Sequence, residues 1–270
     1  MAKLQTVATF ENLMPEEFEI KTRKPKVIFW DIEISPSTGY VWNKWQTDVI
    51  EFVSEWYCMA WSVKYKGGKH ITRCLADYDG YKPGTEDDRA LVKELWEHLD
   101  GCELAIGHNA DRFDRKKINV RFIEHGLPPP KPTASVDTLK VAKKHFAFLS
   151  NKLDDLGNKL GVGRKVKTGG FELWRMCMQG DDAAWARMKK YCKGDVSLLE
   201  RIYDRMLPWI DNHPNLTIIS EKEYGCRNCG SKNLYSRGKQ FTSTGFRNRY
   251  QCNDCKAWMS GKHKPLVEIR

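Results

Sequence analysis

The chain lacks the features that mark several common classes of protein. Its 270 residues contain no apolar run that approaches the roughly eighteen residues needed to span a membrane. The first residues do not have the pattern of a signal peptide, and there is no internal repeat or low-complexity tract. These absences argue against a membrane-spanning, secreted or repeat protein. We therefore expect a soluble intracellular protein with no membrane partner.

Composition and charge predict two unequal parts. The chain is 41% hydrophobic and 30% charged, which is enough for one large core and a small appendage. The net charge is +10, and residues 220–270 carry eleven Lys and Arg against four acids, 11 − 4 = +7. A basic segment of this kind is typical of a part that contacts a polyanion.

Two acids interrupt an apolar, β-branched run near the N-terminus. Residues 26–34 are predicted to form a buried central strand, and the alternation of a strand places Asp31 and Glu33 on one face. Two carboxylates on an apolar face repel each other unless a cation or a proton lies between them. Oxygen ligands favour Mg²⁺ or Mn²⁺. Taken alone, the triplet is better explained by acids at the solvent end of a strand.

Two further acidic motifs fall on predicted helices. Asp114 lies in the first turn of a helix that follows a strand at 103–107, so it faces the sheet edge where α/β proteins place their sites. Tyr191 and Asp195 are four residues apart in a helical pattern from about 181 to 206, and hence share a face. Taken alone, the motif around Asp114 is an ordinary helix cap. Taken alone, Tyr191 and Asp195 are a packed aromatic beside a solvated acid.

Together, the three motifs resemble those of the DEDD exonuclease superfamily. The pattern Asp-x-Glu, then Asn-x3-Phe-Asp at 109–114, then Tyr-x3-Asp at 191–195 has the order and the setting of that superfamily. Its histidine branch has a His five residues before the last Asp, where this chain has Lys190. Tyr191 instead matches the tyrosine branch.

The resemblance covers roughly residues 26–210. Residues 136–161 also look like the segment between the second and third motifs of family-B-polymerase proofreading domains and of stand-alone phage relatives. The resemblance implies an α/β, ribonuclease-H-like fold, with a mixed five-stranded sheet and helices on both faces. The sequence pattern agrees, with a hairpin at 56–65 and 70–76, a helix at 85–99 and a further strand at 134–137.

The activity that the resemblance implies is 3′-to-5′ exonuclease hydrolysis, which releases nucleoside monophosphates with two Mg²⁺ or Mn²⁺ ions. Asp31 would bridge the ions, Glu33 and Asp195 would complete one site, and Asp114 would act on the other. Tyr191 would orient the attacking water, since a phenol is too weak a base at neutral pH. DNA is favoured over RNA as the substrate.

A separate motif predicts a structural zinc site. Cys226, Cys229, Cys252 and Cys255 form two Cys-x2-Cys knuckles, the spacing of a four-thiolate Zn²⁺ site in a zinc ribbon. The alternative of two disulfides is weakened by five further cysteines without obvious pairing and by the absence of a secretory segment.

Several residues are expected to contact nucleic acid. They lie beside the second motif, in a glycine-rich loop and in the ribbon: Asn109, Arg164, Lys165, Lys167, Arg247, Arg249 and Tyr250. For the loop and the ribbon, a solvated basic surface remains the alternative, and a protein-docking module is a further alternative for the ribbon.

These predictions divide the chain into an N-terminal extension (1–25), an exonuclease domain (26–210), a linker (211–219) and a zinc ribbon (220–270). The expected partner is single-stranded or 3′-ended nucleic acid, with a polymerase or a replication or repair protein as a further candidate. The expected location is a prokaryotic or phage-infected cytosol. Two alternatives stay open: a catalytically silent nucleic-acid-binding adaptor, and a structure-selective nuclease or proofreading partner.

Overall fold

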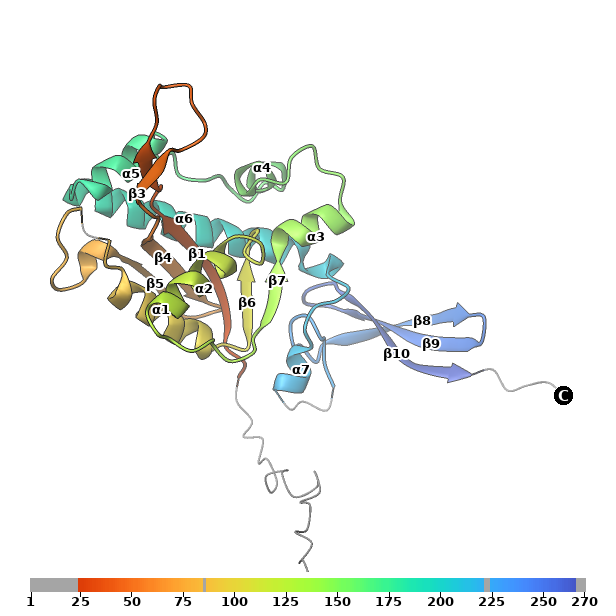
Figure 1. The fold of residues 1–270 in the computed structure, drawn as a ribbon. Helices are drawn as coiled ribbons and strands as arrows, with labels where there is room; N and C mark the ends of the chain where they lie inside the picture. Colours follow the sequence, from red (N-terminus) through yellow and green to blue (C-terminus); the bar gives the residue numbers. More distant parts are fainter. Residues whose placement is uncertain (1–23, 85, 221–223, 266–270) are drawn as a thin grey trace, which may run out of the picture.

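A mixed five-stranded sheet forms the centre of the molecule (Figure 1). The computed structural model describes residues 24–84, 86–220 and 224–265, so the predicted N-terminal extension lies almost entirely outside the described residues. The strand order is β5-β4-β1-β6-β7, in which β1 pairs antiparallel with β4 and parallel with β6. The strands are β1 (Val27–Ile34), β4 (Cys58–Tyr65), β5 (His70–Cys74), β6 (Leu104–Gly107) and β7 (Ala134–Asp137). The predicted sheet is confirmed.

Helices cover both faces of this sheet, also as predicted. Helices α1 (Arg89–Asp100) and α2 (Asp114–Glu124) lie on one face, and the long helix α6 (Asp182–Met206) lies on the other (Figure 1). Strand alternation separates the two cores. Phe29 points to the α6 side, where its ring meets that of Tyr203 at 5.3 Å, while Trp30 belongs to the core on the α1 side.

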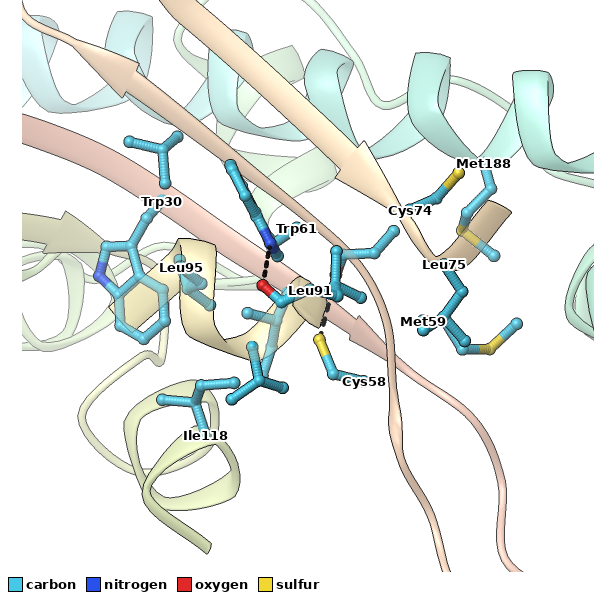
Figure 2. Close-up of a cluster of buried hydrophobic side chains, with 14 of the residues drawn as sticks. Trp30, Cys58, Met59, Trp61, Cys74, Leu75, Leu91, Leu95, Ile118 and Met188 are labelled. Atoms are coloured by element: carbon cyan, nitrogen blue, oxygen red, sulfur yellow. Dashed lines mark hydrogen bonds between the residues drawn. The ribbon is translucent and has the colours of Figure 1, made fainter. Parts of the chain in front are cut away.

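The core on the α1 side is closed by large side chains (Figure 2). Trp61 is fully buried, and its indole N–H donates to the carbonyl oxygen of Leu91 at 2.9 Å. Asp88, also fully buried, accepts hydrogen bonds from the backbone N–H of Cys58 and from the guanidinium of Arg121, and it contacts His125. This carboxylate therefore ties β4 to α1 and α2.

Several elements were not predicted from the sequence. A hairpin of β2 (Thr38–Tyr40) and β3 (Glu51–Ser54) projects beyond the sheet after β1 (Figure 1). Three short helices connect the second and third acidic motifs: α3 (Thr138–His145), α4 (Leu153–Lys159) and α5 (Phe171–Met178). Two 3-10 turns, Leu75–Asp77 and Leu207–Trp209, follow β5 and α6.

A small C-terminal sheet follows α6. Its strands are β8 (Leu234–Thr242), β9 (Gly245–Cys252) and β10 (Trp258–Pro265), in the order β10-β9-β8. The runs 233–236 and 246–251 have a strand-like sequence that predicts β8 and β9, whereas β10 was not predicted. The short helix α7 (Leu216–Ile219) lies inside the segment expected to be a linker.

The C-terminal sheet is fastened to the end of α6. The buried Asn228 amide donates to the carbonyl oxygens of Leu207 and Ile210 at 2.9 and 3.0 Å. The Tyr203 hydroxyl and the His213 imidazole lie 2.6 Å apart beneath this junction. Residues on both sides of the junction are therefore held by hydrogen bonds.

None of the helices in the described ranges is both long and apolar enough to pass through a bilayer.

Candidate functional site

The first pair of predicted site residues lies on β1, the strand that pairs with both β4 and β6. Asp31 and Glu33 follow Phe29 at two-residue intervals, so strand alternation turns all three toward α6. Both acids are part-buried. The apolar residues at the start of the strand are buried in the core, so the two carboxylates near its end lie at the rim of the sheet.

Asp114 reaches the same place from α2. It is the first residue of that helix, it is 4% exposed, and its Oδ1 accepts a hydrogen bond from the backbone N–H of Ile32 at 3.3 Å. Asp31 and Asp114 are eighty-three positions apart in the sequence and lie close enough for the second to raise the pKa of the first.

Helix α6 supplies the remaining two residues. Tyr191 and Asp195 are one turn apart, and Asp195 is only 2% exposed. The ring of Trp174, from α5, packs edge-on against that of Tyr191 at 5.9 Å. The apolar residues of α6 pack on the sheet, and this packing orients the tyrosine and the aspartate toward β1.

The five predicted residues therefore converge, and their acidities show how strongly the carboxylates interact. Burial, followed by the carboxylates of Asp114, Glu33 and Asp195, raises the pKa of Asp31 well above its usual value. Burial and the Asp195 carboxylate raise the pKa of Glu33 to about 8. Burial raises the pKa of Asp114 to about 6. Four acids gathered in one buried place require protons or cations to balance them.

Lys165 is a cation that the structure places among these acids. Its Nζ lies 2.6 Å from Asp195 Oδ2 and 4.9 Å from the centre of the Tyr191 ring. Burial alone would lower the pKa of Lys165, but the contacts with Asp195 and Tyr191 together outweigh burial and raise it, so the amine stays charged. The backbone N–H of Lys165 donates to Asp154 Oδ1 on α4 at 2.8 Å, which holds the loop against the site.

The residues fit a pair of hard divalent cations. All four acids offer oxygen ligands, the set that Mg²⁺ and Mn²⁺ prefer. Asp195 Oδ1 is buried and has no hydrogen-bond partner among the described residues, so one ligand atom is available. The acceptors outnumber the single ammonium group of Lys165, and a divalent ion would relieve the repulsion that raises the pKa values.

Tyr191 is suited to holding a water molecule rather than to removing a proton from it. Burial, followed by the carboxylates of Asp195 and Glu33, raises the pKa of the phenol above its ordinary value. The hydroxyl therefore stays protonated at neutral pH.

Sequence reasoning missed two neighbours of the site. The Cys192 thiol is fully buried, and a ligand atom from each of Cys192, Asp31 and Glu33 lies within 4.8 Å of the others. Trp174 braces Tyr191 from a helix that was not predicted. The position of Cys192 on α6, between Tyr191 and Asp195, was the sequence signal that could have identified this cysteine. No sequence signal marked Trp174.

A hollow of about 600 Å³ opens beside the carboxylates, between α3, α4 and the loop that carries Lys165. Its lining includes Asn109, Lys143, Lys152 and Lys165. Asn109 has a positive φ of 63°, and its backbone N–H donates to Asp137. The other two predicted loop residues, Arg164 and Lys167, are exposed on the same loop.

The four predicted zinc ligands also come together. Cys226 Sγ lies 3.5 Å from Cys255 Sγ, and Cys229 Sγ lies 3.7 Å from Cys252 Sγ. Sulfurs bound about 2.3 Å from a tetrahedral Zn²⁺ are about 3.8 Å apart, so the spacing fits this ion. The four ligand atoms lie within 4.8 Å of one another.

The predicted ribbon contacts divide between two faces. Arg247 and Arg249 lie on one face of β9 and are exposed, whereas Tyr250 points to the other face. The structure therefore does not place the three side chains on one surface.

The mixed sheet, with helices on both faces, defines a ribonuclease-H-like fold. The profile of a family described as the RNase_H superfamily matches residues 64–207, which is more than half of the 270 residues, and the chain belongs to this superfamily. The matched segment includes Asp114, Tyr191 and Asp195 and begins after β1.

Two individual proteins show partial similarity. Protein NEN3 of Arabidopsis thaliana is 32% identical over 75 residues, which are 27% of this chain and 15% of that protein. The family B DNA polymerase of the hyperthermophilic archaeon Pyrobaculum calidifontis aligns with a TM-score of 0.46 and 15% identity, over 82% of this chain and 32% of that one. The chain thus spans less than two thirds of either protein.

Proposed function

We propose that this protein is a metal-dependent 3′-to-5′ exonuclease of the tyrosine branch, acting on nucleic acid and on DNA in preference to RNA. The observation that carries the proposal is the convergence of Asp31, Glu33, Asp114 and Asp195, from three separate elements, on one partly buried place beside Tyr191. Membership of the RNase_H superfamily supports a nuclease.

Each side chain has a role that follows from its position. The four carboxylates would hold two Mg²⁺ or Mn²⁺ ions, which would stabilise the charge on the attacking and leaving oxygens of an in-line displacement. Tyr191, braced by Trp174, would hold the attacking water through its hydroxyl. In the reaction, the water oxygen forms a bond to phosphorus and the bond from phosphorus to the 3′ oxygen breaks. A nucleoside 5′-monophosphate leaves, and the shortened strand keeps a 3′ hydroxyl that takes up a proton.

The hollow beside the site is the proposed path of the strand. Its lining includes Asn109 and three lysines, Lys143, Lys152 and Lys165, whose charges attract phosphates. Lys165 would exchange its contact with Asp195 for a phosphate when ions neutralise that carboxylate. Arg164 and Lys167, exposed on the same loop, would extend the basic surface.

The C-terminal sheet is proposed to be a zinc ribbon with one structural ion held by the four thiolates. The sulfur spacings support this, and metal binding would supply folding free energy to a unit of about fifty residues. The proposed division remains an exonuclease domain at 26–210, a linker at 211–219 and a ribbon at 220–270.

Digestion of labelled oligonucleotides tests the activity. Wild-type protein should shorten a 5′-labelled single strand one nucleotide at a time when Mg²⁺ or Mn²⁺ is present. A strand whose 3′ end is chemically blocked should resist. Asp195→Asn should lower the rate by about a thousandfold, the order reached when a charge-stabilising group is removed from an active site. Matched DNA and RNA strands measure the sugar preference.

Asp204→Asn is the matched control. Asp204 lies on the same helix, outside the cluster, with its Oδ1 3.5 Å from Lys66, so the same change of charge should leave the rate within about twofold. Equal digestion of 3′-blocked and free strands would contradict the proposed 3′-to-5′ direction of hydrolysis. Binding of the strand without digestion in either metal would favour the adaptor alternative.

A further inference from the structure

The C-terminal sheet has two chemically different faces. Cross-strand partners share a face, and β9 pairs Arg247 with Gln240 and His263, Arg249 with Ser260, and Gln251 with Trp258. Gln251 also pairs with Tyr235. We name the surface formed by all these residues the arginine face. The opposite face carries Phe246, Tyr250, Lys239 and Lys264.

The arginine face combines positive charge with exposed aromatic rings. The Arg249 guanidinium lies 5.7 Å from the centre of the Trp258 ring, and that of Arg237 lies 5.0 Å from the Tyr235 ring. Tyr235 and Trp258 are 58% and 48% exposed. Side chains of this kind grip phosphates and stack on bases.

A shallow hollow of about 500 Å³ lies in this face, and none of the described residues that line it is an Asp or Glu. Its lining includes Arg227, Arg247 and Arg249, together with Trp258.

The charge of the whole unit has the same sign. Residues 224–265 contain nine Lys and Arg and a single acid, Asp254, so 9 − 1 = +8, or +6 when four thiolates hold one Zn²⁺. That acid accepts a hydrogen bond from Asn233 and is next to Cys255 in the sequence. A polyanion is therefore favoured over an acidic patch on a folded protein, since the face offers stacking surfaces together with guanidinium groups.

The arginine face lies far from the carboxylates. Met206, the last residue of α6, is eleven positions after Asp195, and the C-terminal unit is fastened to the chain just beyond it. This part of the helix alone rises about 16 Å. The strands β8 to β10 then project away from the end of α6 (Figure 1). One nucleotide of a helical strand advances about 3.4 Å, so a strand must exceed about five nucleotides to occupy both places.

We propose that the arginine face is a second nucleic-acid-binding site, which holds the strand upstream of its 3′ end and makes affinity depend on strand length. This inference rests on the proposed function, because the substrate of the first site is taken to be the same strand. The face acts by binding and contacts none of the reacting atoms.

The test measures binding by fluorescence anisotropy without divalent ions, so that no strand is cut. Labelled DNA single strands of about 4 and about 30 nucleotides lie on either side of the length set by the helix. Wild-type protein should bind the long strand at least about tenfold more tightly. The double variant Arg247→Gln, Arg249→Gln should lose most of that advantage, about ten- to thirtyfold, and the salt dependence should fall by about 1.4 in slope, since two phosphate contacts are lost.

The matched control is Lys239→Gln with Lys264→Gln, which removes two charges from the opposite face of the same sheet. This variant should keep most of the advantage of the long strand. Zinc content and melting temperature confirm that both double variants fold. An equal loss in the two variants, or no loss in the arginine variant, would overturn the inference. Failure of metal-dependent digestion would instead overturn the proposed function, and the anisotropy result does not depend on it.

Discussion

Replacing Glu33 by Gln tests the repulsion among the buried carboxylates. In the fold, the pKa of Glu33 is raised to about 8 from an ordinary value of 4.5, by burial and then by Asp195. An acid with a raised pKa leaves the fold at full stability below the ordinary pKa and costs stability as the pH rises toward the raised one. Without divalent ions, the variant should therefore be more stable than the wild type at pH 7.5, although it removes a proposed ligand.

The size of the effect follows from the same pKa. A pH of 7.5 lies about three units above the ordinary pKa of Glu33. Keeping the proton on the folded chain at this pH costs about 4 kcal/mol, at roughly 1.4 kcal/mol per unit. Relaxation and water penetration reduce such figures, and we expect about 2 kcal/mol. For a chain of this length, this corresponds to a rise of about 4–8 °C in melting temperature.

Thermal melts in buffers free of Mg²⁺ and Mn²⁺ measure this difference at pH 5 and pH 7.5. The gap should be large at pH 7.5 and should shrink strongly at pH 5, which lies only about half a unit above the ordinary pKa of Glu33. Glu172→Gln, on the exposed surface of α5 beside Arg175, should change the melting temperature by no more than about 1–2 °C. A Glu33→Gln variant that melts at or below the wild type at pH 7.5 would show that the ionised Glu33 does not destabilise the fold.

Two other substitutions and a metal titration test further contacts. Tyr191→Phe should lower kcat by about ten- to a hundredfold with little change in KM, because the phenol is proposed to orient water; steady-state kinetics check this, and an unchanged kcat would remove the role. Asp88→Asn should destabilise the fold by about 3 kcal/mol, since it leaves the Arg121 guanidinium without its buried partner; chemical denaturation measures the loss. Mn²⁺ affinity should rise steeply between pH 6 and pH 8, because Glu33 and Asp114 must release protons first; calorimetry in buffers of different ionisation heat should detect those protons.

The sequence predicted the sheet because its signals were local. The run around Asp31 is apolar and β-branched, so both the strand and its burial follow from composition. The period of the last helix likewise predicted residues 181–206, against Asp182–Met206 in the structure. The convergence of the acids could be expected only from the resemblance, since no local signal specifies which strand and which helix meet.

The parts that were not predicted depend on tertiary contacts. Helices α3, α4 and α5 have seven or eight residues each, too short for a reliable period. The contact between Lys165 and Asp195 joins a loop to a helix, and a glycine-rich loop has no periodic pattern that aims a side chain. The strand β10 has a polar, charged sequence with a bulge, so its alternation is broken.

A crystal soaked with Mn²⁺ and a short single strand, with anomalous data collected at the manganese edge, shows directly whether the four carboxylates hold two ions. Two anomalous peaks should lie within bonding distance of Asp31, one of them also bonded to Glu33 and Asp195 and the other reached by Asp114. Absence of manganese from this place, with the carboxylates turned away from one another, would contradict the proposed two-metal site.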